Sequence, residues 1–149
     1  MNRSNKLKLP DINKILRTHE LRVTEPRRQI LALLLNSNRA VSSNQLEQLV
    51  SQSDRVTIYR SLKRFEETGI IHKVIGENGV SFYALCQDDC TKYLHQDEHD
   101  HFYCKECDQM LCLEKHVWND LNLPEGYSVN KANLVLQGKC EKCNEKEIE

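Results

Sequence analysis

The spacing of hydrophobic residues divides the chain into a helical first part and a strand-rich second part. Apolar residues recur at three- and four-residue intervals in four segments before residue 69, which is the pattern of amphipathic helices. We expect helices over residues 11–19, from 25 to about 36, from 43 to 50 and from 55 to about 68. Capping residues support these boundaries: Thr24, Ser42 with Gln45, and Asp54 at the starts, and Gly69 at the last end.

A β-hairpin is predicted directly after the fourth helix. Residues 70–75 and 80–85 are two short apolar runs, and Gly76-Glu77-Asn78-Gly79 between them is a typical turn sequence. Helices followed by a two-stranded hairpin indicate a winged helix-turn-helix, in which the last helix enters the major groove of DNA.

The fourth helix has an apolar face and a basic face. Ile58, Leu62 and Phe65 form the inward stripe. On the other side, Tyr59 and Arg60 suit base edges or thymine methyls, whereas arginines and lysines suit phosphates. The candidate DNA-binding residues are Arg22, Arg27, Thr57, Tyr59, Arg60, Lys63 and Arg64, with Arg28 beside them. The alternative is a small helical bundle with a solvated basic face.

Charge is distributed unequally along the 149 residues. Residues 1–75 carry a net charge of +7 and residues 76–149 carry −8, which suggests phosphates as partners of the first half and cations as partners of the second. Chance grouping of surface charge is the alternative. The sequence has no secretory signal and no apolar run of membrane-spanning length, so we expect a cytoplasmic protein without membrane association. Its seven cysteines then require an explanation other than disulfides.

Four of these cysteines predict a structural zinc site. Cys104 and Cys107 form one C-x2-C pair, and Cys140 and Cys143 form a second. Two such turns together supply four thiolates in tetrahedral arrangement. The intervening residues are expected to form a small α/β unit, with a strand over 110–113, a helix over 114–121 and a strand over 127–136. Reduced cysteines without metal and a redox-active pair are the weaker alternatives.

A second metal site is predicted from the remaining cysteines and histidines. His99 and His101 have the alternation that places two imidazoles on one face of a strand, which suits zinc, iron or manganese. Cys86, Cys90 and Cys112 are unassigned thiols nearby in the sequence, and His72 lies on the first strand of the hairpin.

Four stretches together resemble the ferric uptake regulator superfamily, whose members sense iron, zinc, manganese or peroxide. They are Leu21-Arg22-Val23-Thr24-Glu25-Pro26-Arg27, Val56-Thr57-Ile58-Tyr59-Arg60-Ser61-Leu62, His99-Asp100-His101-Phe102-Tyr103-Cys104-Lys105-Glu106-Cys107, and the Cys140 to Cys143 pair. The resemblance implies an α+β fold in which an N-terminal winged helix-turn-helix precedes a small α/β dimerisation domain. The corresponding divisions are a DNA-binding domain at 1–86, a hinge loop at 87–98 and a metal-binding dimerisation domain at 99–149.

The resemblance also implies a homodimer that binds a double-stranded DNA operator when a hinge metal is bound. Tyr59 and Arg60 would contact the DNA, and the four paired cysteines would hold one structural Zn²⁺ in each protomer. His99 and His101 would be ligands of the hinge metal.

Departures from the iron-type pattern favour zinc as the regulatory metal. Iron-type members usually have a histidine where this chain has Ala40, a carboxylate where it has Ala84, and Glu or Asp where it has Cys112. The sequence around the hairpin, including Cys86, is similar to the zinc-uptake-regulator branch. Thiolates with imidazoles favour tetrahedral zinc over octahedral iron or manganese. The expected hinge ligands are Cys86, His99, His101 and Cys112, with His72 or Cys90 as possible substitutes.

The predicted function is therefore a metal-responsive transcriptional repressor that senses zinc and controls metal-uptake genes. One alternative keeps DNA binding but senses iron, manganese, or peroxide through oxidisable thiols. Another is a zinc-binding interaction module without DNA binding. An enzyme is not expected, because no Ser/His/Asp pattern or paired-carboxylate pattern stands out.

Overall fold

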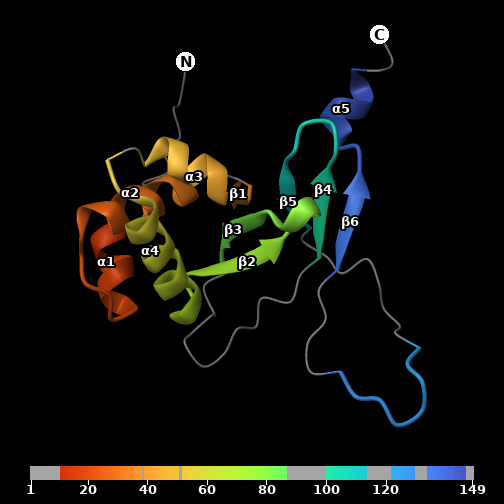
Figure 1. Cartoon of the computed structure of the whole chain (residues 1–149), viewed down its shortest axis with the longest axis horizontal. Helices are drawn as coiled ribbons and strands as arrows, with labels where there is room; N and C mark the ends of the chain where they lie inside the picture. The colour runs from red at the N-terminus through yellow and green to blue at the C-terminus, as the bar shows by residue number, and fades with distance from the viewer. Residues whose placement is uncertain are drawn as a thin grey trace, which may run out of the picture.

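Four helices form the first part of the molecule. The computed structural model describes residues 11–37, 39–50, 52–86, 100–113, 122–129 and 134–146. The helices are α1 (Ile12–Thr18), α2 (Glu25–Asn36), α3 (Ser43–Leu49) and α4 (Arg55–Glu67), and they pack together at one end of the molecule (Figure 1). All four start within a residue or two of the predicted positions, and polar side chains cap three of them, α1, α3 and α4. The Asp11 carboxylate accepts from the backbone of α1, and Asp54 accepts from the backbone N–H of Thr57 at 2.6 Å.

The capping of α2 and α3 differs. Ser42 and Gln45 form the predicted capping box, in which each side chain bonds to the other residue's backbone N–H. Thr24 occupies the N-cap of α2, but its side chain makes no capping hydrogen bond. Pro26 lies in the first turn of that helix, where its missing N–H costs nothing.

The hairpin after α4 belongs to a three-stranded sheet. Strands β2 (Ile71–Ile75) and β3 (Ser81–Leu85) pair antiparallel around the short 3₁₀ helix η1 (Glu77–Gly79). A two-residue strand, β1 (Val41–Ser42), adds to the other edge of β3, which gives the order β1-β3-β2. The predicted hairpin is present, but the sheet has a third strand, β1, that was not predicted. Two residues are too few to produce a periodic pattern in the sequence.

The main hydrophobic core lies between the helices and this sheet. Ile58, Leu62 and Phe65 are almost completely buried, as their helical spacing predicts. They pack with residues of α1, α2 and α3 and with Ile71 and Tyr83 of the sheet. Gly69 has a φ of +82°, the left-handed conformation that ends α4 and turns the chain into β2.

A second sheet contains the three strands that follow residue 100 in the described part of the chain. Its strands are β4 (His101–Cys104), β5 (Met110–Cys112) and β6 (Val135–Gly138), in the order β5-β4-β6, with β4 parallel to β6. A short helix, α5 (Glu141–Glu145), follows β6. The strand predicted over 127–136 was wrong at its start, because the strand begins at Val135 and residues 127–129 are not in a strand. The helix predicted over 114–121 lies outside the described residues.

The two sheets meet through a small apolar cluster. Met110 of β5 is fully buried and packs with Phe82 of β3 and Val74 of β2. The backbone N–H of Ala40 donates to the carbonyl oxygen of Met110 at 3.2 Å. At the end of the hairpin, Lys105 and Glu77 form an ion pair at 3.6 Å. The hairpin thus joins the helices to the second sheet (Figure 1). Within the described part of the chain, no helix is long and apolar enough to span a membrane.

Candidate functional site: two metal centres and a basic helix

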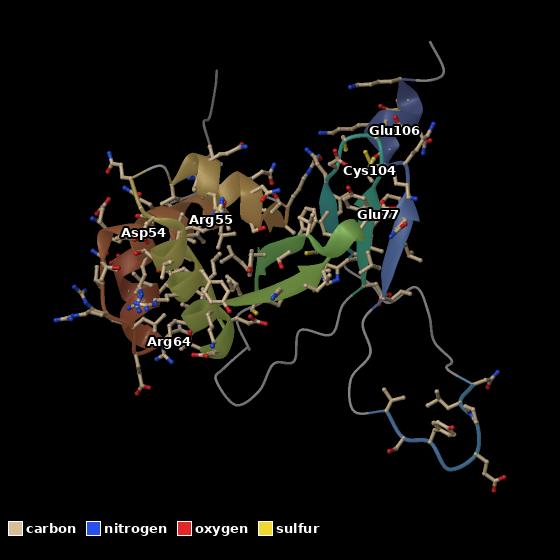
Figure 2. The ribbon with its side chains drawn as sticks, viewed as in Figure 1. Asp54, Arg55, Arg64, Glu77, Cys104 and Glu106 are labelled. Carbon is tan, nitrogen blue, oxygen red and sulfur yellow. The ribbon has the colours of Figure 1, made fainter. Side chains whose placement is uncertain are left out.

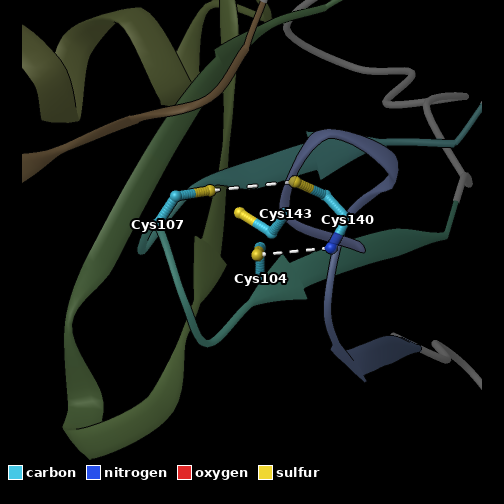
Figure 3. A group of neighbouring side chains, drawn as sticks. All are labelled: Cys104, Cys107, Cys140 and Cys143. Carbon is cyan, nitrogen blue, oxygen red and sulfur yellow. Dashed lines mark hydrogen bonds between the residues drawn. The ribbon is translucent and has the colours of Figure 1, made fainter. Parts of the chain in front are cut away.

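The four paired cysteines lie together at one end of the second sheet. Cys104 ends β4, Cys107 lies in the turn before β5, and Cys140 and Cys143 lie at the start of α5. One sulfur from each residue lies within 4.8 Å of the other three (Figure 3). The parallel pairing of β4 with β6 places Cys104 opposite Gly138 and so brings the two C-x2-C turns side by side.

The spacing of the sulfur atoms fits a zinc ion. A tetrahedral site with Zn–S bonds of 2.3 Å separates neighbouring sulfurs by about 3.8 Å. The Sγ atoms of Cys107 and Cys140 are 3.9 Å apart. The backbone N–H of Cys140 also donates to Sγ of Cys104 at 3.3 Å, which stabilises a thiolate at that position (Figure 3).

Protonation within this cluster is unequal. Hydrogen bonding from the Cys140 backbone lowers the pKa of Cys104 to about 6. The hydrogen bond with Cys140 raises the pKa of Cys143 to about 12, and burial is the largest cause that raises the pKa of Cys107. Four thiolates cannot all ionise this close together without a cation, because like charges disfavour one another. The cluster therefore has the donor chemistry of a structural Zn²⁺ site.

A second group of ligand atoms lies where the two sheets meet. His72 of β2, His101 of β4 and Cys112 of β5 each offer an atom within 4.8 Å of the others. His101 and Cys112 are directly opposite each other in the β4–β5 pairing, which places both side chains on one face. The Nε2 atoms of His72 and His101 are 3.2 Å apart. A tetrahedral zinc ion separates two imidazole nitrogens by about 3.3 Å, so this pair also matches a zinc site.

Cys86 lies next to this group but on the other side of the His72 ring. Its Sγ is 3.8 Å from Nδ1 of His72, whereas Nε2 of the same ring faces His101. Cys86 therefore contacts the nitrogen that points away from the cluster and is placed to orient the imidazole. His99 and Cys90, the other expected or substitute ligands, lie outside the described residues.

From the sequence, His72 was predicted only as a substitute ligand of the second metal site. A single histidine on a strand becomes interpretable only when strand pairing places it beside another ligand, and His72 and His101 are 29 residues apart. Asp100 is not among the predicted site residues, and it is buried beside His101. The position of Asp100 between His99 and His101 could have indicated that this carboxylate lies near the metal ligands.

The basic residues lie at the opposite end of the molecule, on α4 and around the start of α2. Tyr59 is 58% exposed and Arg60, Lys63 and Arg64 are exposed, on the side of α4 away from its buried stripe. Figure 2 shows Arg64 on this outer side, far from Cys104. Thr57 is half-buried, and its N–H is used by the Asp54 cap.

Arg27, near the start of α2, interacts with both Arg22 and Arg64. The guanidinium of Arg27 donates to the carbonyl oxygen of Arg22 at 2.8 Å. Burial, followed by the charges of Arg64 and Arg22, lowers the pKa of Arg27. Arg64 also pairs with Glu67 at 2.8 Å. Both side chains are exposed, so this pair is weak and leaves the guanidinium able to bind another anion.

Comparison with known proteins identifies the family. The family model described as "Ferric uptake regulator family" matches residues 18–137. The ferric uptake regulation protein of Yersinia pestis is 29% identical over 150 residues, which cover 95% of this chain and 96% of that protein. The corresponding protein of Escherichia coli K12 is 28% identical, with 89% and 90% covered.

Solved structures share the fold. A zinc uptake regulator complexed with zinc and DNA has a TM-score of 0.62 at 22% identity and covers 92% of this chain and 93% of that one. The Vibrio cholerae ferric uptake regulator has a TM-score of 0.59 at 24% identity, with 87% and 100% covered. Because the family model spans most of the sequence, the chain belongs to the ferric uptake regulator family and is a metal-responsive transcription regulator, not an enzyme.

Proposed function

We propose that the protein is a zinc-sensing repressor that binds operator DNA as a homodimer and controls metal-uptake genes. The observation that carries the proposal is the group formed by His72, His101 and Cys112 where the two sheets meet. Its ligands come from both sheets, so an ion bound there would hold the hairpin of the first part against the strands of the second.

The donor set favours zinc over iron or manganese. Two imidazoles and a thiolate suit tetrahedral zinc, whereas octahedral sites for manganese or iron are richer in oxygen ligands. Two of the three positions where iron-type relatives are expected to have ligands, Ala40 and Ala84, carry buried methyl groups in the apolar cluster around Met110. We propose Cys86 or His99 as the fourth ligand. If His99 is the fourth ligand, Cys86 orients the His72 ring through its contact with Nδ1.

Zinc would act by stabilising one arrangement of the two parts of the chain. A ligand shifts a conformational equilibrium only by its difference in affinity between the states. The arrangement in which His72 lies 3.2 Å from His101 completes the ligand group, and separation of the sheets would dismantle it. In a homodimer, this arrangement would fix the distance between the two DNA-binding parts.

The remaining assignments complete the proposal. Residues 1–86 would form a winged helix-turn-helix, with α4 in the major groove, and residues 99–149 would form the dimerisation domain after a hinge at 87–98. One structural Zn²⁺ per protomer would be bound by the four paired cysteines. Its role is supported by α5, which buries none of its residues within the described part of the chain and therefore gains little from core packing.

The test is DNA binding at buffered free metal concentrations. Reduced protein is titrated onto duplex DNA from upstream of its own gene in zinc, iron(II) or manganese(II), and zinc content is measured in parallel. We expect tight binding with zinc only. His101→Ala and Cys112→Ser should raise the free zinc needed for binding by at least about tenfold, with the structural zinc retained. His19→Gln, a histidine of the first helical region, is the matched control and should behave as the unmodified protein.

A thiol sensor is the second candidate, because the exposed Cys112 lies in the same group as His72 and His101. Binding that ignores every metal and falls when the protein is oxidised would support this candidate and contradict the zinc proposal.

A further inference from the structure

The first turn of α4 exposes an aliphatic side chain that the core does not use. Val56 is 56% exposed, whereas Ile58, two residues later, is 3% exposed. The buried cluster beneath α4 includes Ile58, Leu62 and Phe65 but not Val56. An isolated exposed valine is ordinary on a protein surface, so its position relative to other residues decides whether it has a role.

Val56 lies on the same face of α4 as the residues proposed to reach the bases. Positions i, i+3 and i+4 of a helix are neighbours, and these are Val56, Tyr59 and Arg60. Tyr59 is 58% exposed and Arg60 is exposed as well. This face therefore combines an apolar group, an aromatic ring and a guanidinium at the N-terminal end, which is the end of a recognition helix that contacts base edges.

The polar residues around Val56 are held by contacts within the protein. The Asp54 carboxylate accepts from the N–H of Thr57 at 2.6 Å, and the Arg55 guanidinium pairs with Glu47 of α3 at 3.2 Å. Figure 2 shows Asp54 and Arg55 together at this end of the helix. The exposed Arg55–Glu47 pair adds little, whereas the Asp54 cap fixes the first turn of α4, so the Val56 side chain is presented from a fixed backbone. Its branched Cβ also restricts rotation about χ1, which lowers the entropy lost on contact.

We infer that Val56 is a specificity-determining residue that contacts the C5 methyl group of a thymine in each half-site; this inference rests on the proposed function. The thymine methyl is the one apolar group that base pairs present in the major groove. The basic side chains along the same helix, Lys63 and Arg64, supply the complementary charge for the phosphates on either side.

The contact has a defined size. Burying one methyl group changes an equilibrium constant by about fourfold, and two half-sites give about fifteenfold for a dimer. Because a methyl group carries no charge, its removal should leave the salt dependence of binding unchanged. Loss of a phosphate contact, in contrast, lowers the slope against salt concentration.

The experiment removes the methyl group from the DNA and the valine from the protein. Full-length, zinc-loaded protein first selects duplexes from a random 30-base-pair library. Each thymine pair of the selected duplex is then replaced by deoxyuridine, which lacks only the C5 methyl. Binding is measured for the unmodified protein, for Val56→Ala, and for Leu49→Ala as the control. Leu49 is 62% exposed at the end of α3, outside the proposed base-contacting face.

We expect one symmetric thymine position at which deoxyuridine weakens the unmodified protein and Leu49→Ala by about fifteenfold. Val56→Ala should bind the thymine duplex correspondingly less tightly and lose most of its response to deoxyuridine there, with an unchanged salt slope. If Val56→Ala responds to deoxyuridine as fully as the unmodified protein at every position, the inference is wrong while the DNA-binding proposal stands. Failure of the zinc-loaded protein to select any duplex would overturn the proposed function and this inference with it.

Discussion

Replacing Met110 by alanine should destabilise the protein more than any surface change, because Met110 joins the two sheets. The side chain is fully buried among Val74, Phe82 and Ala84. Its Cε lies 3.5 Å from the position that a Cβ on Gly76 would occupy, and the same Cβ would lie 2.7 Å from the ring of Phe82. This close packing limits how far the surroundings can move to fill a cavity.

The expected loss follows from the size of the deleted side chain. Truncating a buried methionine to alanine costs about 2–5 kcal/mol, and the limited room for collapse places Met110→Ala near 3 kcal/mol. For a chain of this length that corresponds to a fall in Tm of about 6–12 °C. Met110→Leu conserves most of the volume and should cost less than about 1.5 kcal/mol.

Urea unfolding, followed by circular dichroism at fixed protomer concentration and saturating zinc, measures both variants. A loss below about 1 kcal/mol for Met110→Ala, or equal losses for the two variants, would refute the claim that this side chain fills the junction between the sheets.

Three further predictions concern separate parts of the molecule. Cys104→Ser should remove the structural zinc and melt α5, seen as loss of one zinc per protomer and of helical signal; a zinc-replete, fully folded variant would contradict the four-cysteine assignment. Arg60→Ala should weaken sequence-specific DNA binding by at least about tenfold, the value of one bidentate base contact, with zinc content and dimerisation unchanged; an unfolded variant would instead make Arg60 structural. Ser42→Ala should cost about 1 kcal/mol by loss of the α3 cap, whereas Ser43→Ala, one residue later, should be nearly neutral in the same unfolding assay.

Elements whose signals are local could be predicted from the sequence. Helices α1 to α4 were predicted because their apolar periodicity and their capping residues lie within each segment. The Ser42–Gln45 capping box is an example. The grouping of the two C-x2-C pairs followed from ligand spacing, which requires little knowledge of the intervening chain.

Features that depend on distant pairing could not be predicted. Strand β1 exists only because Val41 and Ser42 meet Tyr83 and Phe82 across the sheet. His72 ranked as a substitute ligand because nothing near it in the sequence indicates that β4 will bring His101 within 3.2 Å. The late start of β6 at Val135 has the same origin, since β4 is its partner and pairing rather than composition sets its limits.

The apolar cluster between the sheets also bears on how such proteins can be recombined. Of its five buried residues, Ala40, Val74, Phe82 and Ala84 precede residue 87, and only Met110 follows it. A chimera joined at residue 86 would therefore divide one packed unit between two parents. Exchange of the part after residue 86 with a relative should yield a stable regulator only if the residues facing Met110 are exchanged with it. The proposed domain boundary at residue 86 is therefore not a boundary at which modules can be exchanged independently.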